Sequence, residues 1–301
     1  MIDVKIGIAH TTLLEDDGSI PDPAEVARHL EGLGLDSMWA SDHLAWGTPI
    51  LESTLALAAA AGVTERIELG FSVMQLALRP IAWAAKQIGT LQTLSAARVQ
   101  LGVGIGGYPA DEWPAAGQSL IGRARRTDAA LRVLPDLLVG KPTELPGVSG
   151  SAVTLRPGAP MPPIWIGGDS EAALRRAARF GDGWLPASIT LPRLRAGRDR
   201  LEQLSGPEGR PAPVTGISVF GTLNAHLGGM SRAALVDMMA GGWGFDRDVA
   251  EAAVLSGTPD AVAERLAAYR DCGVEHVVVC PLGNSWRRQC ELLTEAVSLL
   301  G

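Results

Sequence analysis

Short apolar runs alternate with longer amphipathic segments along nearly the whole chain. The apolar runs predict strands over residues 5–10, 36–43, 66–76, 98–106, 164–168, 183–187, 213–221 and 276–282. The segments between them predict helices over residues 21–34, 51–62, 79–95, 119–139, 170–181, 191–204, 231–240, 246–255, 259–273 and 285–300. Because the strands are apolar throughout rather than in alternation, they indicate a parallel sheet that is covered on both faces.

Eight strands, each followed by at least one helix, favour an α/β fold, a (β/α)8 TIM barrel in which residues 1–301 form a single domain. The rival is a doubly wound open sheet with a second domain. A GxGxxG fingerprint after the first strand would support that rival, but this strand ends in Ala9-His10-Thr11. The Pro- and Gly-rich stretch at 141–163 is expected to be an insertion before strand five.

Composition and charge exclude several classes of protein. Of the 301 residues, 47% are hydrophobic and 20% are charged, which excludes intrinsic disorder. The net charge of −7 and the scattered basic residues argue against a nucleic-acid partner. Three cysteines without a CxxC pair, and dispersed histidines, argue against a disulfide framework and a metal site. With neither a signal peptide nor a membrane-spanning run in sight, we expect a cytoplasmic protein without membrane association.

In a TIM barrel the active site lies at the C-terminal ends of the strands. This rule selects His10, Asp42, His43, Ser72 to Gln75, Gly104 to Gly107, Gly167 to Ser170, Trp184 to Ser188, Phe220 to Thr222 and Cys280 to Leu282. His43 lies over the expected pocket, where a histidine serves as an acid/base group or as a hydrogen-bond partner of a ring nitrogen. Asp42 is expected either to orient His43 or to cap the second helix.

Other residues near the strand ends have two interpretations each. Trp46 either walls an aromatic pocket or is an ordinary packed tryptophan. Gly104, Gly106 and Gly107 remove side chains that would block a flat ligand, although glycines also mark turns. Glu112 either faces the pocket or caps a following helix.

Two further expectations concern the surroundings of the pocket. Residues 167–170 precede a helix whose free N–H groups form an anion site, unless they are simply a helix cap. The pocket walls are expected to come from loops 44–52, 107–118, 141–163 and 222–230.

Together these residues resemble the bacterial luciferase-like superfamily of flavin- and deazaflavin-dependent enzymes. The resemblance is carried by SDHL at 41–44 and by long segments at 64–106, 162–186 and 256–279, so it covers nearly the full chain. It implies the same (β/α)8 barrel, with the ring of the cofactor over the strand ends. The PPIWIGG…GDGW form at 162–184 is most similar to the branch that uses the deazaflavin coenzyme F-420, and FMN is the alternative cofactor.

The resemblance also implies roles for particular residues. Gly167, Gly168, Asp169 and Ser170 would hold the phosphate of the cofactor, and Gly104, Gly106 and Gly107 would face its ring. A non-proline cis peptide at Ser72-Val73 would back the ring, and Asp42-His43 would be the acid/base site. The remaining candidates for cofactor contact are His10, Trp46, Met74 and Trp184.

The implied activity is hydride transfer between a reduced deazaflavin or flavin and a small organic substrate. His43 would exchange the proton, assisted by Asp42 or Glu112. The alternatives are an FMN-dependent monooxygenase and a non-catalytic flavin-binding homologue. Sugar-phosphate dehydrogenases of this family carry a glutamate where this chain has Gly107, so a sugar-phosphate substrate is disfavoured.

Helices 51–62 and 80–94 are more apolar than barrel packing needs. Together with the dimers that are common in the family, this predicts a homodimer.

Overall fold

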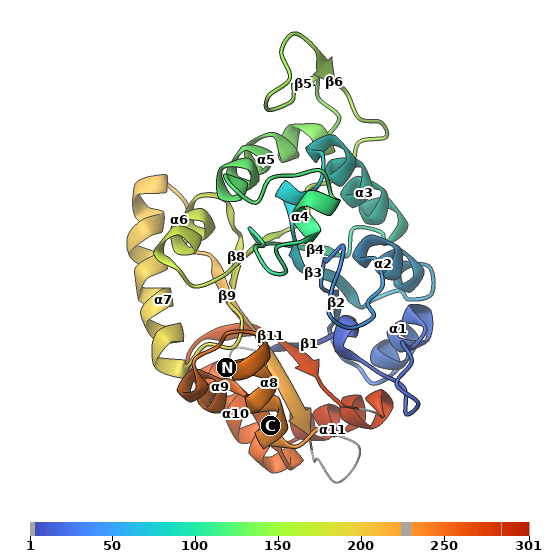
Figure 1. Cartoon of the computed structure of the whole chain (residues 1–301), viewed down its shortest axis with the longest axis vertical. Helices are drawn as coiled ribbons and strands as arrows, with labels where there is room; N and C mark the ends of the chain where they lie inside the picture. The colour runs from blue at the N-terminus through green and yellow to red at the C-terminus, as the bar shows by residue number, and fades with distance from the viewer. Residues whose placement is uncertain (1–3, 224–229, 284, 301) are drawn as a thin grey trace.

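The computed structural model describes residues 4–223, 230–283 and 285–300, and within them eight parallel strands close into a ring (Figure 1). In order around the ring these are β1 (Lys5–Ala9), β2 (Ser37–Ala40), β3 (Glu68–Met74), β4 (Val99–Val103), β7 (Ile164–Gly167), β8 (Gly183–Leu185), β9 (Val214–Leu223) and β11 (Val274–Pro281). Pairing of β11 with β1 closes the barrel. The predicted (β/α)8 barrel is therefore confirmed.

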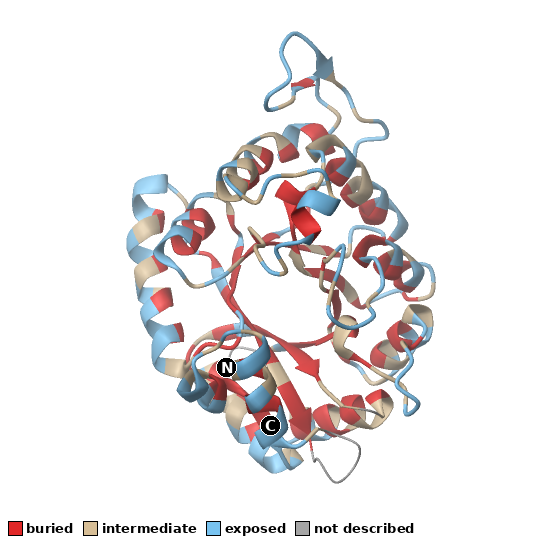
Figure 2. Cartoon of the chain, viewed as in Figure 1, coloured by how far each residue is buried: buried red, intermediate tan, exposed pale blue. Residues whose placement is uncertain are grey.

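Helices surround the strands and bury one face each against them (Figure 2). They are α1 (Pro23–Gly32), α2 (Ser53–Ala61), α3 (Ile81–Leu94), α5 (Arg123–Leu138), α6 (Glu171–Phe180), α7 (Leu191–Ser205), α8 (Arg232–Gly242), α9 (Arg247–Ala253), α10 (Pro259–Asp271) and α11 (Trp286–Ser298), with short 3-10 turns at His10–Thr12, Leu76–Leu78 and Gly206–Glu208. Local sequence sets their starts: Asp22 accepts a hydrogen bond from the Ala24 N–H, and Pro23 begins α1.

The inside of the barrel is filled by aromatic rings. Trp39, Trp165 and His276 pack edge to face, with ring centroids 5.3–6.4 Å apart. Ser37 Oγ bonds His276 Nε2 and accepts the Trp39 indole N–H, both at 2.7 Å. Burial lowers the pKa of His276 to about 3, so this ring is neutral. A cofactor must therefore bind above this plug, at the strand ends.

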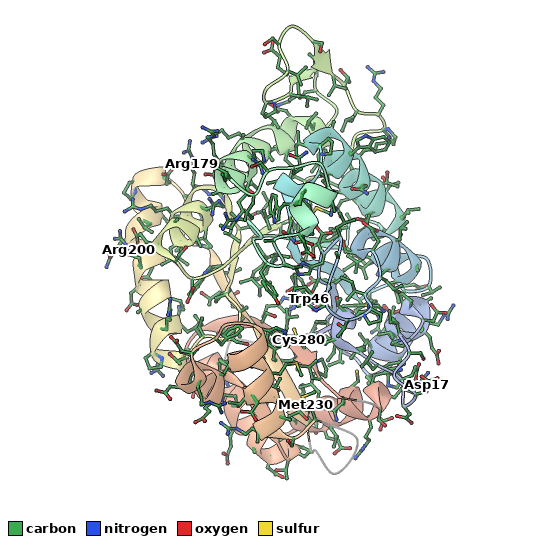
Figure 3. All side chains as sticks on the ribbon, in the orientation of Figure 1. Asp17, Trp46, Arg179, Arg200, Met230 and Cys280 are labelled. Atoms are coloured by element: carbon green, nitrogen blue, oxygen red, sulfur yellow. The ribbon has the colours of Figure 1, made fainter. Side chains whose placement is uncertain are left out.

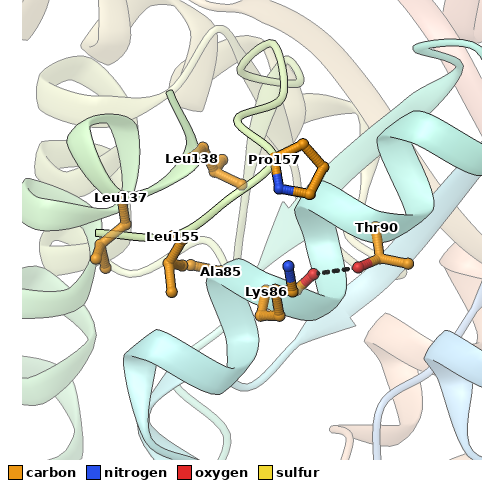
Figure 4. A pocket seen from close by; sticks show the side chains of 8 residues that line it. Ala85, Lys86, Thr90, Leu137, Leu138, Leu155 and Pro157 are labelled. Atoms are coloured by element: carbon orange, nitrogen blue, oxygen red, sulfur yellow. Dashed lines mark hydrogen bonds between the residues drawn. The ribbon is translucent and has the colours of Figure 1, made fainter. Parts of the chain in front are cut away.

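The insertion at 141–163 lies at the N-terminal face of the barrel, opposite the C-terminal ends of the strands where the active site is expected. It connects the C-terminus of α5 to the start of β7, and both are at the N-terminal face. Its hairpin, β5 (Thr143–Glu144) with β6 (Ala152–Val153), projects beyond α3 and α5 (Figure 1). A small pocket at its base is lined by Ala85, Lys86, Gly89, Thr90, Leu137, Leu138, Leu155 and Pro157 (Figure 4). The prediction that this insertion walls the active-site pocket is wrong.

Other differences from the predicted elements are small. The loop after β4 contains a short helix, α4 (Glu112–Ala115). The predicted helix over 246–255 ends at Ala253, and Leu255–Gly257 forms β10 beside the end of β9. Most of the expected wall loop 222–230 lies outside the described residues. Among the described helices, none has both the length and the apolarity to cross a bilayer.

Candidate active site

A histidine and a buried glutamate meet at the mouth of the barrel. His43 follows β2, and Glu112 opens α4 in the loop after β4. The Nδ1 atom of His43 lies 3.3 Å from each carboxylate oxygen of Glu112. The Glu112 side chain is fully buried, whereas 19% of the His43 side chain is exposed. Glu112 therefore contacts His43 rather than capping α4, whose N-cap is Asp111, and its exposure to a pocket stays a prediction.

Gln75, at the end of β3, joins this pair although it was given no role from the sequence. Its Nε2 donates to the Asp42 carbonyl oxygen at 2.7 Å and to Glu112 Oε1 at 3.0 Å. The Leu44 N–H donates to Glu112 Oε2 at 3.0 Å. The buried carboxylate is thus held by donors from two segments, one after β2 and one after β3. The sequence does contain a signal for Gln75, because this polar residue directly follows an apolar strand.

Asp42 fixes the backbone around His43 rather than its ring. Its carboxylate accepts from Ser53 Oγ at 2.9 Å, the Gln75 N–H at 2.8 Å and Arg79 Nη2 at 2.6 Å. The cap of α2 is Glu52, which accepts the Leu55 N–H. Both predicted roles of Asp42 are therefore corrected, since Glu112 orients His43 and Glu52 caps the helix.

Trp46 provides an aromatic surface beside His43. The two rings lie 4.3 Å apart between centroids at 34°, and Tyr108 packs edge-on against Trp46 at 5.6 Å. In the view of Figure 3, Trp46 and Cys280 lie near the centre of the ring of strands, whereas Arg179 and Arg200 lie on the outer helices. Trp46 is thus packed against two other rings, and its role as the wall of an aromatic pocket stays a prediction.

The strand-four glycines make room for side chains of β3. A Cβ on Gly104 would lie 2.3 Å from Val73 Cγ2, and one on Gly106 would lie 1.8 Å from Gln75 Oε1. The idea that these two glycines leave open space for a ligand is thus corrected. The Ser72-Val73 peptide is cis, as the resemblance implied. The half-buried Val73 side chain packs against the apolar cluster inside the barrel and offers an apolar surface to a flat ring.

A possible anion site lies where α6 begins. Ser170 is the N-cap and accepts the Ala173 N–H at 3.2 Å, so the predicted cap is confirmed. Gly168, just before it, has a φ of +89°. Asp169 pairs with Arg193, with an Nε–Oδ2 distance of 2.6 Å. Free first-turn N–H groups, the Ser170 hydroxyl and Arg193 suit a phosphate, whereas the Asp169 carboxylate serves to hold Arg193.

Three residues expected to touch a cofactor are enclosed by protein. Met74 and Trp184 are fully buried in the core between the barrel and its helices, and the Trp184 indole N–H donates to the Gly168 carbonyl at 2.8 Å. His10 is 2% exposed, and burial lowers its pKa to about 4. Direct contact is wrong for these three, and Trp184 instead supports the loop before α6.

The arrangement at the strand ends fits a flat ring with a phosphate arm. Val73 supplies an apolar platform, Trp46 an aromatic side, and the α6 N-terminus an anion cradle. The partly exposed His43 ring, held by Glu112, is a candidate acid/base group at the same end of the barrel.

Comparison with known proteins identifies relatives of this chain and of its fold. Residues 4–240 match the family described as luciferase-like monooxygenase. An uncharacterised protein of Mycobacterium tuberculosis is 36% identical over 167 residues, a match that covers 53% of this chain and 57% of that protein. The chain thus spans little more than half the length of these mycobacterial relatives.

Two further matches extend over almost the whole chain. An F420-dependent glucose-6-phosphate dehydrogenase of Amycolatopsis mediterranei is 25% identical, over 92% of this chain and 93% of that protein. A solved F420-dependent secondary alcohol dehydrogenase, in complex with an F420-acetone adduct, superimposes with a TM-score of 0.83. It is 15% identical and covers 99% of both chains, which shows a shared fold.

Proposed function

The chain belongs to the luciferase-like monooxygenase family, and we propose that it is an oxidoreductase that uses coenzyme F-420 to transfer a hydride to or from a small organic substrate. The observation that carries this proposal is the His43–Glu112 pair at the barrel mouth. The pair lies at the same end of the barrel as the Val73 platform. Full-length similarity to an F420-dependent dehydrogenase supports the choice of cofactor.

The protein supplies orientation and proton transfer. When bound, the deazaflavin accepts or donates a hydride. His43 takes the proton that an alcohol releases on oxidation, or gives a proton to the carbonyl oxygen on reduction. Glu112 faces Nδ1 of the ring with its carboxylate and holds the plane of the ring. Trp46, stacked on His43, limits the positions that a substrate can take beside the ring.

The cofactor would be held by two parts of the site. Val73 and Ser72 would lie against its ring. The first turn of α6, with Gly167, Gly168 and Ser170, would bind the phosphate together with Arg193.

We propose a substrate other than a sugar phosphate. In the luciferase-like family that this chain resembles, sugar-phosphate dehydrogenases carry a glutamate at the position of Gly107. Here the space beside Gly107 is bordered by Arg123, whose Nη2 would lie 3.2 Å from a Cβ at that position. The chain therefore has no glutamate proton donor at this position, and Arg123 donates a hydrogen bond to the Gly106 carbonyl.

An FMN-dependent monooxygenase is the second candidate function, because the family is described by that activity. Titration of the cofactor-free protein with FMN and with coenzyme F-420, followed by quenching of cofactor fluorescence, separates the two. Tight binding of coenzyme F-420 and weak binding of FMN are expected. The reverse order would favour the monooxygenase, and tight binding without turnover of any substrate would favour a non-catalytic homologue.

We also propose a cytoplasmic homodimer formed through α2 and α3. Leu55 on α2 is 72% exposed and Trp83 on α3 is 68% exposed, which is unusual for such large apolar side chains. The three cysteines are free and buried, as is typical of a reducing compartment. Light scattering at micromolar concentration is expected to give the mass of two chains, and a monomer would contradict the dimer.

A further inference from the structure

We propose that Gln75 is a positioning residue that fixes His43 in the tautomer with the proton on Nδ1, so that Nε2 is the atom that exchanges protons with the substrate. The tautomer itself follows from the contacts among three buried or half-buried side chains. Only its catalytic consequence rests on the proposed oxidoreductase function.

The proposal begins with a count of hydrogens. The Gln75 amide carries two, and two acceptors take them: the Asp42 carbonyl at 2.7 Å and Glu112 Oε1 at 3.0 Å. Nε2 of Gln75 also lies 3.3 Å from His43 Nδ1, but it has no third hydrogen to donate there. An unprotonated Nδ1 would therefore find no donor from Gln75 and would face both oxygens of Glu112 at 3.3 Å.

A proton on Nδ1 resolves this arrangement. Nδ1 then donates to the Glu112 carboxylate, so that both carboxylate oxygens and the Asp42 carbonyl face a donor. In the neutral ring the remaining nitrogen, Nε2, keeps its lone pair. It is thus ready to accept the hydroxyl proton of a substrate and to return it in the reverse reaction.

The orientation of the Gln75 amide is itself determined by its neighbours. Reversing it would set Oε1 against the Asp42 carbonyl and the Glu112 carboxylate, two repulsive contacts. In the observed orientation Oε1 is buried without a hydrogen-bond partner, on the side of Gly106. An unpaired buried acceptor is costly, so the two donated bonds must outweigh it.

Both ends of Gln75 are anchored, which keeps the amide in place. Its backbone N–H donates to Asp42 Oδ2 at 2.8 Å while its side chain donates to the Asp42 carbonyl. Asp42 is in turn held by Arg79. The Gln75 amide is thus held in place by Asp42, the residue before His43.

The first test reads the tautomer directly, by 15N NMR of the histidine rings in the cofactor-free protein, with His43 assigned from a His43→Gln variant. Above neutral pH, His43 is expected to show a protonated Nδ1 and an unprotonated Nε2. A protonated Nε2 in the unaltered protein would overturn the proposal, whatever the activity of the enzyme. This result is independent of the proposed function.

The second test removes the donors. Gln75→Met keeps the length of the side chain but removes the donor that holds Glu112 Oε1 against His43. With the carboxylate released, a mixture of His43 tautomers is expected. Gln75→Leu, which also removes both amide donors without adding a charge, serves if the methionine variant does not fold. Gln92→Met is the matched control, because Gln92 is also a buried glutamine with backbone partners, in α3 near its C-terminal end. A unique Nδ1–H tautomer in a folded Gln75 variant would overturn the role of Gln75.

The kinetic consequence separates positioning from substrate binding. Gln75→Met is expected to lower kcat about 10- to 100-fold, with little change in KM or in cofactor affinity. Gln92→Met is expected to leave kcat unchanged. A rise in KM at constant kcat would contradict the positioning role. If no substrate is turned over by the unaltered protein, the proposed function fails. The assignment of the His43 tautomer is then still tested by the NMR measurement, which does not depend on turnover.

Discussion

The Nδ1 atom of His43 is equally distant, at 3.3 Å, from the two carboxylate oxygens of Glu112. The acid is fully buried and the histidine is partly exposed, so one edge of the ring is held inside the protein. A group arranged in this way can change its protonation at the open edge while its partner keeps it oriented. The relationship joins residues 69 positions apart in the chain.

His43→Ala is expected to lower kcat by about 10²-fold or more, because it removes the group that exchanges the substrate proton. Affinity for the cofactor should change little, since Val73 and the α6 N-terminus are untouched. Steady-state kinetics and fluorescence titration measure the two quantities separately. Unchanged turnover would remove His43 from the mechanism.

Asp42→Asn is expected to destabilise the protein by about 3 kcal/mol, because it breaks a buried ion pair and leaves Arg79 without its partner. Denaturant unfolding measures the loss. Asp136→Asn, in an exposed pair with Lys141, is the matched control and should produce no measurable change. Equal losses in the two variants would argue against a special role for the Asp42 network.

Ser170→Ala is expected to cost about 1 kcal/mol of stability by removal of the α6 cap, and also to weaken cofactor binding several-fold. Ser231→Ala removes the equivalent cap of α8, where Ser231 Oγ accepts the Ala234 N–H at 3.1 Å. It should therefore cost similar stability but leave cofactor affinity unchanged. Equal affinities in both variants would show that the start of α6 does not hold the phosphate.

Gly104→Ala tests the fit between β4 and β3. The new Cβ would lie 2.3 Å from Val73 Cγ2, so overpacking is expected to cost about 1–3 kcal/mol and to weaken cofactor binding. Gly32→Ala in α1, where the Cβ meets nothing within 4 Å, should instead be neutral or slightly stabilising. Adding Val73→Ala to Gly104→Ala should recover part of the stability, and simple additivity would contradict a direct clash.

The barrel and the position of His43 follow from the sequence because both depend on local pattern. Apolar runs in βα alternation determine the ring of strands, and a strand end determines the face on which His43 lies. The identity of its carboxylate partner does not follow in this way. Glu112 reaches His43 only because the loop after β4 folds into α4, which depends on tertiary contacts.

The wrong predictions for the insertion 141–163 and for Trp184 could have been avoided, whereas the one for Met74 could not. An insertion between a helix and the next strand must lie at the N-terminal face, so 141–163 could have been excluded from the pocket. Trp184 lies between Gly183 and Leu185, and the alternation of side chains in a strand could have placed it outside the barrel. Met74 is different, because the register of β3 shifts between Phe71 and Met74 and alternation no longer holds.

The buried histidines predict how stability depends on pH. Burial lowers the pKa of His276 to about 3 and that of His10 to about 4, from 6.5. Below pH 6.5 the unfolded chain binds protons that the folded protein does not, so stability falls as the pH decreases, by up to about 1.4 kcal/mol per pH unit for each ring.

Urea unfolding between about pH 7 and pH 5 measures this slope before most carboxylates titrate. His276→Gln should reduce the slope, although it also lowers stability at neutral pH by loss of the Ser37 contact, and adding His10→Gln should reduce the slope further. An unchanged slope in the double variant would mean that both rings are protonated in the folded protein, contrary to their burial.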